Sequence, residues 1–255
     1  MTRLQTQNLC VEIGGRKVCD NLQLSLNPGE IWGVLGRNGV GKTTLLHTLA
    51  GLRTAASGNI LLDQQDIAQL PRRSVAQKLG LLLQHIEDAF PVSVLETVVS
   101  GRHPHISNWQ WENRADYAMA HSALERVEMD SFSQRQVNEL SGGERQRVSI
   151  ATLLTQNPDI FLLDEPSSHL DLKYQIQLLD ILSDKARKQQ KTILMTLHDL
   201  NLAARFCDSV LLLTGDGNTL MGKTEALLTE ENLMKMYDYP IIRVKSAGRS
   251  VFVAK

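Results

Sequence analysis

A glycine-rich run between residues 36 and 43 could bind the phosphates of a nucleotide. Its sequence, Gly-Arg-Asn-Gly-Val-Gly-Lys-Thr, fits the pattern G-x-x-x-x-G-K-[ST], although an ordinary glycine turn could share it. Glycines let successive backbone N–H groups point into one concavity, and a helix beginning at Lys42 adds the positive end of its dipole. Lys42 would reach the β- and γ-phosphates, and the Thr43 hydroxyl would ligate Mg²⁺. The predicted phosphate-binding residues are Gly36, Arg37, Asn38, Gly39, Val40, Gly41, Lys42, Thr43 and Thr44.

Two adjacent carboxylates follow a short apolar run. Ile160–Leu163 predicts a buried strand, and Asp164 and Glu165 come directly after it. Because parallel sheets present ligand groups at their strand ends, Asp164 would hold Mg²⁺, directly or through water. Glu165 would then polarise the water that attacks the γ-phosphate. The alternative is a solvated acidic turn before Pro166.

A third segment, Leu140–Glu144, combines a helix cap with two glycines. Ser141 and Glu144 form a capping box, which predicts a helix from about Gly143 onward and needs no further function. Gly142 and Gly143, however, lower helix stability and expose backbone N–H groups beside the Ser141 hydroxyl. Such a positive helix end is a second anion site, so Ser141, Gly142, Gly143 and Glu144 are further predicted nucleotide contacts.

Together these segments resemble the Walker A, signature and Walker B motifs of an ABC-type ATPase domain. Shorter family elements are present too: Gln84 after an apolar run, the segment Ser168–Asp171, and His198 after the apolar run Ile193–Leu197. The match extends over nearly the whole chain. The resemblance implies an α/β fold, a P-loop NTPase of the ABC type. Such a fold has a RecA-like parallel-sheet core, an N-terminal antiparallel β subdomain and an inserted helical subdomain.

The resemblance also implies a head-to-tail dimer, in which residues 36–43 of one copy and 141–144 of a second copy enclose each ATP. The catalytic residues it implies are Lys42, Gln84, Glu165 and His198, and the Mg²⁺ contacts are Thr43, Gln84 and Asp164. Asp171 would contact the site across the dimer, and His198 would bond the γ-phosphate. Simpler explanations are a polar strand end at Gln84, a helix cap at Asp171 and a satisfied core histidine at His198.

One position departs from the family pattern. ABC domains usually place an aromatic side chain near the start of the chain, where it stacks on adenine, and the corresponding position here is Ile13. Arg16 is the alternative stacking partner. We therefore expect weaker selectivity for the base, while the phosphate chemistry is unaffected.

Two further segments narrow the resemblance. Residues 101–105 (Gly-Arg-His-Pro-His) and 198–205 (His-Asp-Leu-Asn-Leu-Ala-Ala-Arg) are similar to ATPase subunits of importers for iron-siderophores, haem and cobalamin. This implies integral membrane permease subunits as partners, a periplasmic or surface substrate-binding protein, and a peripheral location on the cytoplasmic face of the inner membrane. Residues 85–92 and the helical insertion are the expected docking surface. His103 and His105 could bind a metal, but a surface turn is the preferred interpretation.

Other functions share parts of this pattern. An exporter ATPase for lipid, haem or drug would carry every catalytic motif, and only residues 101–105 and 198–205 argue against it. A non-transport ABC protein would normally bring two ATPase domains, a long coiled coil or a basic surface, none of which the sequence shows. A binding module without turnover would need a damaged Glu165 or His198, and both are intact.

The elements that position these residues are indicated by periodicity. Alternating apolar residues over 9–13 and 18–26, separated by two glycines, predict an antiparallel β unit with a turn. Ile31–Leu35 predicts a strand ahead of the glycine run, and the helix after it should reach Ala50 and stop at Gly51.

The rest of the chain divides into a helical part and an alternating part. Residues 91 to about 139 are predicted as a helical insertion, with a Ser93–Glu96 capping box and a helical pattern over 114–127. From Ile160 on, strands alternate with helices, which predicts a parallel sheet covered on both faces. The expected elements are strands at 160–163, 193–197 and 210–214, helices at 172–189 and 200–206, and a hairpin of 241–244 with 251–253. We expect one ABC domain over 1–255, with a core of 1–90 and 155–255 and a helical subdomain of 91–154.

Composition limits the function classes. The chain has 255 residues and a net charge of −1, so no global basic excess points to nucleic acid. Cys10, Cys19 and Cys207 form no C-x-x-C pair, and the first residues show no secretory apolar region, which indicates reduced, buried thiols. The apolar runs are shorter than the ~20 residues that cross a bilayer, so any work at a membrane requires docking on a partner.

Overall fold

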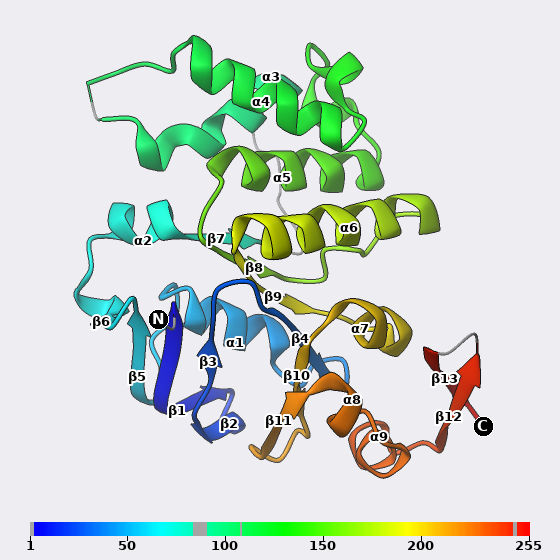
Figure 1. Cartoon of the computed structure of the whole chain (residues 1–255). Helices are drawn as coiled ribbons and strands as arrows, with labels where there is room; N and C mark the ends of the chain where they lie inside the picture. Colours follow the sequence, from blue (N-terminus) through cyan, green and yellow to red (C-terminus); the bar gives the residue numbers. More distant parts are fainter. Residues whose placement is uncertain (1–2, 84–90, 108, 247–248) are drawn as a thin grey trace.

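A computed structural model of the chain describes residues 3–83, 91–107, 109–246 and 249–255. Its central sheet has the strand order β11-β10-β4-β9-β8-β7. All neighbours pair in parallel except β10 and β11. The strands are β4 (Ile31–Gly36), β7 (Leu79–Leu82), β8 (Ile160–Leu163), β9 (Thr192–Thr196), β10 (Ser209–Leu213) and β11 (Thr219–Lys223). The predicted parallel sheet is therefore confirmed, and Figure 1 shows it running through the middle of the molecule.

An antiparallel sheet precedes the central one along the chain. β1 (Leu4–Ile13) pairs with β2 (Arg16–Leu22), β3 (Ser25–Leu26) and β5 (Ser57–Leu62). β6 (Gln65–Asp66) pairs antiparallel with β5. The turn between β1 and β2 is made by Gly14 and Gly15, both at positive φ, as the sequence predicts. β5 and β6 are absent from that prediction, because their short apolar runs lack a strong local signal.

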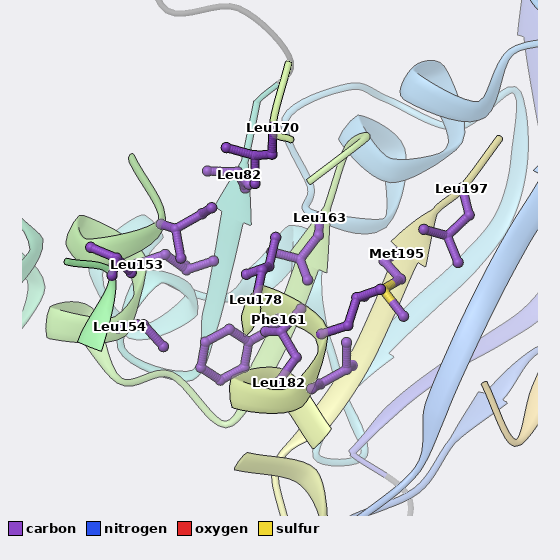
Figure 2. Close-up of a cluster of buried hydrophobic side chains, with 14 of the residues drawn as sticks. Leu82, Leu153, Leu154, Phe161, Leu163, Leu170, Leu178, Leu182, Met195 and Leu197 are labelled. Carbon is purple, nitrogen blue, oxygen red and sulfur yellow. The ribbon is translucent and has the colours of Figure 1, made fainter. Parts of the chain in front are cut away.

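The central sheet separates two hydrophobic clusters. Alternate residues of its strands, such as Ile160 and Leu162, pack with Leu45, Leu46 and Leu49 of α1 (Lys42–Leu49) and with the antiparallel sheet. The other set, such as Phe161 and Leu163, packs under α5 (Gly142–Gln156), α6 (Leu172–Gln189) and α7 (Leu200–Phe206). Figure 2 shows part of this second cluster, with Phe161 and Leu163 of β8 beside Leu178 and Leu182 of α6. Helices thus cover both faces of the sheet.

A helical layer lies above α5 (Figure 1). It contains α3 (Val94–Val99), the 3-10 turn η2 (Ser100–His105), α4 (Arg114–Arg126) and the short turns η3 (Asp130–Phe132) and η4 (Val137–Glu139). Capping boxes begin α3 at Ser93 and α5 at Ser141, and both match the sequence prediction. Because α5 contacts α3 and α4 as well as β7, the division into a core and a helical subdomain stays a prediction.

The remaining elements complete the edges of the domain. They are η1 (Ile67–Gln69), α2 (Arg72–Lys78), α8 (Thr224–Leu227), α9 (Glu230–Tyr237), β12 (Ile241–Ser246) and β13 (Arg249–Ala254). β12 and β13 form the predicted C-terminal hairpin. All three cysteines are free and buried. In the described part of the chain, no helix combines the length and the apolar character that crossing a membrane requires.

Candidate active site

The P-loop, residues 36–43, connects the carboxyl end of β4 to the start of α1. Lys42 is 6% exposed, and its ammonium donates to the Gly36 carbonyl (2.9 Å) and the Arg37 carbonyl (3.3 Å). Burial lowers the pKa of Lys42, while the nearby carboxylates of Glu165 and Asp164 act in the opposite direction. The structure therefore brings the predicted lysine and the two predicted carboxylates to one place.

Gly41 is the N-cap of α1 and has a φ of 108°. A Cβ atom built there would lie 2.4 Å from Val18 Cγ2, so β2 presses directly on the loop. No side chain caps this helix start, and its first turn contains no acidic residue. The start of α1 is consequently left to an anion from outside the chain. Sequence reasoning did not identify Val18, because its contact with the loop depends on tertiary packing.

Asp164 is fully buried at the end of β8 and is oriented by a neighbouring strand. Thr196, the last residue of β9, donates its hydroxyl to Asp164 Oδ1 (2.8 Å) and accepts the Glu165 N–H (2.7 Å). Asp164 Oδ2 is buried and has no hydrogen-bond partner among the described residues. A buried carboxylate oxygen without a partner fits a divalent cation, because hard cations prefer oxygen ligands. Thr43, a half-buried residue of α1, is the predicted hydroxyl ligand.

Sequence reasoning missed Thr196. The available signal is its hydroxyl within the otherwise apolar run Ile193–Leu197, two residues before His198. Its function depends on register: β8 and β9 pair in parallel with Leu163 opposite Met195, which sets Asp164 and Thr196 side by side.

His198 meets Glu165 at the same edge of the sheet. His198 Nε2 lies 2.5 Å from Glu165 Oε1, and the two side chains are 44% and 16% exposed. The histidine is thus on the surface of the site and in contact with the predicted base, rather than satisfied within the core. Gln84, the fourth predicted catalytic residue and a predicted Mg²⁺ contact, lies outside the described residues, as do residues 85–90 of the expected docking surface.

The predicted second anion site, at the start of α5, has a different environment. Ser141 and Gly142 are exposed. Glu144 Oε2 accepts hydrogen bonds from the Ser141 N–H and hydroxyl (both 2.7 Å), which lower the pKa of Glu144. In the described part of the chain, no hydrogen bond or ion pair joins these residues to the P-loop. Among the described residues, therefore, no such contact links the two predicted halves of the nucleotide site within one copy.

The start of α5 packs instead against the segment after Glu165. A Cβ atom on Gly143 would lie 2.9 Å from the His169 carbonyl oxygen, and the buried Gln146 donates to the Pro166 carbonyl (3.1 Å). Asp171 caps α6 by accepting the Tyr174 N–H (3.1 Å). The simple explanation of Asp171 as a helix cap is correct within one copy, and its contact across a dimer stays a prediction.

Three other residues weighed in the sequence lie outside this cluster. His103 Nε2 is 3.2 Å from Glu112 Oε1, and His105 Nε2 is 2.9 Å from the Gln156 carbonyl. His103 thus contacts a residue shortly after η2, and His105 contacts the end of α5. Ile13, the position expected to face adenine, is 42% exposed at the end of β1.

Comparisons with known proteins show which proteins this chain resembles. Residues 19–168 match the family model described as ABC transporter. The chain is 39% identical over 230 residues to the petrobactin import ATP-binding protein FpuD of Bacillus anthracis, an alignment that covers 89% of this chain and 84% of the relative. It is 38% identical over 259 residues to the hemin import ATP-binding protein HmuV of Pseudomonas aeruginosa, covering 99% and 100% of the two chains.

Solved structures show the same fold. A putative metal-chelate type ABC transporter in an inward-facing conformation superposes with a TM-score of 0.86 at 31% identity, over 100% of this chain and 98% of that one. A dimeric bacterial ABC transporter cassette superposes with a TM-score of 0.76 at 25% identity, over 87% of this chain and 98% of that one.

Proposed function

Since this chain belongs to the ABC transporter family and is an ATPase of that type, we propose that it energises import of a metal chelate through a membrane permease. The observation that carries the proposal is the cluster of the buried Lys42 and Asp164 with Glu165 and the more exposed His198, at the carboxyl ends of β4, β8 and β9. A positive helix start, a buried cation and two carboxylates are what phosphoryl transfer to water requires.

Lys42 and the P-loop backbone bind the β- and γ-phosphates of ATP. The ammonium now bonded to two loop carbonyls exchanges these for phosphate oxygens, and the uncapped start of α1 adds its N–H groups. The Thr43 hydroxyl, Asp164 Oδ2 and Gln84 would hold Mg²⁺, which neutralises charge on the phosphates. Thr196 holds the carboxylate of Asp164 through Oδ1 and leaves Oδ2 without a hydrogen-bond partner among the described residues.

Glu165 acts on the attacking water. Its carboxylate accepts the proton of the water molecule, and its backbone is fixed by the bond from its N–H to Thr196. His198 contacts the same carboxylate through Nε2 and would hydrogen-bond the γ-phosphate with the same ring once nucleotide is bound. His198 thereby orients the carboxylate of Glu165, and its bond to the γ-phosphate forms only when ATP is bound.

The exposed start of α5 supports a two-copy site. Its N–H groups and the Ser141 hydroxyl are too exposed to bind phosphate strongly in one copy, because water competes for them. A head-to-tail dimer places Ser141–Glu144 of one copy over the ATP of the second and excludes that water. Asp171 would then contact the site across the dimer, and the dimeric cassette among the similar structures supports this arrangement.

The cargo is inferred from the relatives. The similar proteins are named for petrobactin import, hemin import and metal-chelate transport, which favours an iron-siderophore, haem or cobalamin as substrate. We place the chain on the cytoplasmic face of the inner membrane, bound to integral permease subunits. A periplasmic or surface binding protein delivers the chelate from the other side.

Reconstitution tests this function. The chain and its permease are placed in proteoliposomes that enclose Mg-ATP, and binding proteins loaded with an iron-siderophore, haem or cobalamin are added outside. We expect one of them to raise ATP hydrolysis above the rate with its empty form, and the Glu165→Gln variant to show no stimulation. Equal rates with every loaded and empty binding protein would contradict import of a metal chelate.

A further inference from the structure

A cavity outside the predicted nucleotide site reaches the amino end of β10. It has a volume of about 820 Å³ and is bordered by α7, α8 and the β12–β13 hairpin. Asp208, in its wall, directly precedes β10, and its carboxylate accepts the N–H of Ile31 at the start of β4 (2.9 Å). The P-loop begins where β4 ends, at Gly36. The cavity reaches the amino ends of β4 and β10, whereas the P-loop follows the carboxyl end of β4, and the family motifs do not account for the cavity.

The hairpin forms one wall of the cavity and is fixed to α7. The Asn201 side chain donates to the Phe252 carbonyl (3.2 Å) and accepts the Phe252 N–H (2.8 Å). Phe252 is 7% exposed, and Cys207 and Leu228 of the lining are buried as well, so the apolar surface open to the cavity includes the half-buried Ala204 and Val251. In Figure 1 the hairpin stands at the edge of the molecule beside α7.

Cations dominate the rim of this cavity. The lining includes four cationic side chains, Arg205, Lys223, Arg243 and Lys245, and two carboxylates, Asp208 and Glu225. The Asp208 carboxylate is already paired with Arg187 outside the lining (2.6 Å). Among the residues that the structure describes, the ammonium groups of Lys223 and Lys245 have no hydrogen bond or ion pair, so they are available to a ligand.

From this arrangement we propose that the cavity binds a small amphipathic anion, a carboxylate, sulfonate or phosphate carried on an apolar body. The apolar body lies on Ala204 and Val251, and the anionic group lies between Lys223 and Lys245. The volume is within the range of about 300–1,000 Å³ that is usual for small-molecule sites. This inference does not depend on the nucleotide chemistry.

Anilinonaphthalene sulfonate, an aromatic body with one anionic group, is a suitable probe. Its fluorescence is titrated with the full chain in saturating Mg-ADP, so that the nucleotide site is filled. The double variant Lys223→Gln, Lys245→Gln should bind the probe about five- to tenfold more weakly, since each exposed charge contact is worth up to about 1 kcal/mol. The double variant Lys223→Arg, Lys245→Arg should retain the wild-type affinity.

Two controls keep the result specific. Lys188→Gln with Lys235→Gln removes the same charge from two exposed helix positions elsewhere and should change the affinity less than about twofold. N-phenyl-naphthylamine, which lacks the sulfonate, should bind the wild type at least about fivefold more weakly than the sulfonate. Absence of saturable binding, equal weakening in both glutamine pairs, or equal affinity for the neutral probe would each overturn the proposal.

Discussion

The starts of α1 and α5 both present backbone N–H groups beside glycines, yet they differ in capping and in charge. The start of α1 has no side-chain cap and no acidic residue in its first turn, and it carries the buried Lys42. The start of α5 is capped by its own Ser141 and Glu144 and is exposed. The first carries a buried positive charge before any ligand arrives, although Arg37, Asn38 and Gly39 of its loop are exposed. The second has its hydroxyl occupied, so it becomes a strong phosphate site only when another surface covers it.

Glu165→Gln is expected to give the largest effect, because it removes the base beside Lys42 and leaves the α5 start unchanged. Hydrolysis should fall by about 10²- to 10⁴-fold, while ATP still binds. The ATP-bound dimer should then persist and elute as a dimer on size-exclusion chromatography. Phosphate release at the wild-type rate would exclude Glu165 as the base.

Mixing two inactive variants tests whether the two helix starts act on one ATP from different copies. Lys42→Ala disables the P-loop and Ser141→Arg blocks the α5 start, so each protein alone should be inactive. A heterodimer contains one intact site, and an equal mixture should recover about a quarter of the wild-type ATPase rate. If the mixture stays at the level of the single variants, the shared site is wrong.

Thr196→Val removes the hydroxyl that orients Asp164 and nearly preserves the side-chain volume. Losing this buried bond should raise the Mg²⁺ concentration needed for half-maximal ATPase activity about tenfold. Direct titration with Mn²⁺, followed by electron paramagnetic resonance, should show the same weakening without turnover. Thr196→Ser should keep the wild-type Mg²⁺ dependence and Mn²⁺ affinity. An unchanged metal dependence in Thr196→Val would show that Thr196 does not orient Asp164 for metal binding.

Lys185 on α6 is a second buried lysine, and among the described residues no carboxylate raises its pKa as Glu165 and Asp164 raise that of Lys42. Burial, with the charges of Arg126 and Lys191, lowers its pKa from 10.5 to about 8. The folded state therefore disfavours the charged lysine, and this cost is fully present below pH 8. The cost fades as the pH rises from about 8 to about 10.5, where the unfolded chain also loses the proton.

Lys185→Met should accordingly raise the free energy of unfolding by about 1–3 kcal/mol at pH 7, less near pH 10. Urea unfolding at both pH values measures this, and ATPase activity should not change. Lys188→Met, three residues further on the exposed face of α6, is the control and should give no such gain. A loss of stability in Lys185→Met at pH 7 would contradict the argument.

The smallest expected effect compares two equivalent caps. Ser93 and Ser141 begin α3 and α5 with the same capping box. Ser93→Ala and Ser141→Ala should each lower the free energy of unfolding by about 1 kcal/mol. Only Ser141→Ala should also lower the ATPase rate, because only that hydroxyl is proposed to contact phosphate. Equal rates in the two variants would show that Ser141 is a cap and nothing more.

Much of the site was predictable because its signals are local. The P-loop, the caps at Ser93 and Ser141, and the strand before Asp164 each depend on residues close together in the chain. The elements missed from sequence, such as β5, α2 and α9, are short or weakly periodic, so packing rather than local preference defines them.

The sequence by itself determined the identities of the phosphate-binding and acidic residues, since glycines, a lysine and carboxylates at fixed spacing carry their chemistry with them. Tertiary structure alone decided how they cooperate. The register of β8 and β9 sets Thr196 against Asp164, and the carboxyl ends of β8 and β9 bring His198 to Glu165. These relations join residues about 30 or more positions apart in the chain, and no local pattern encodes such contacts.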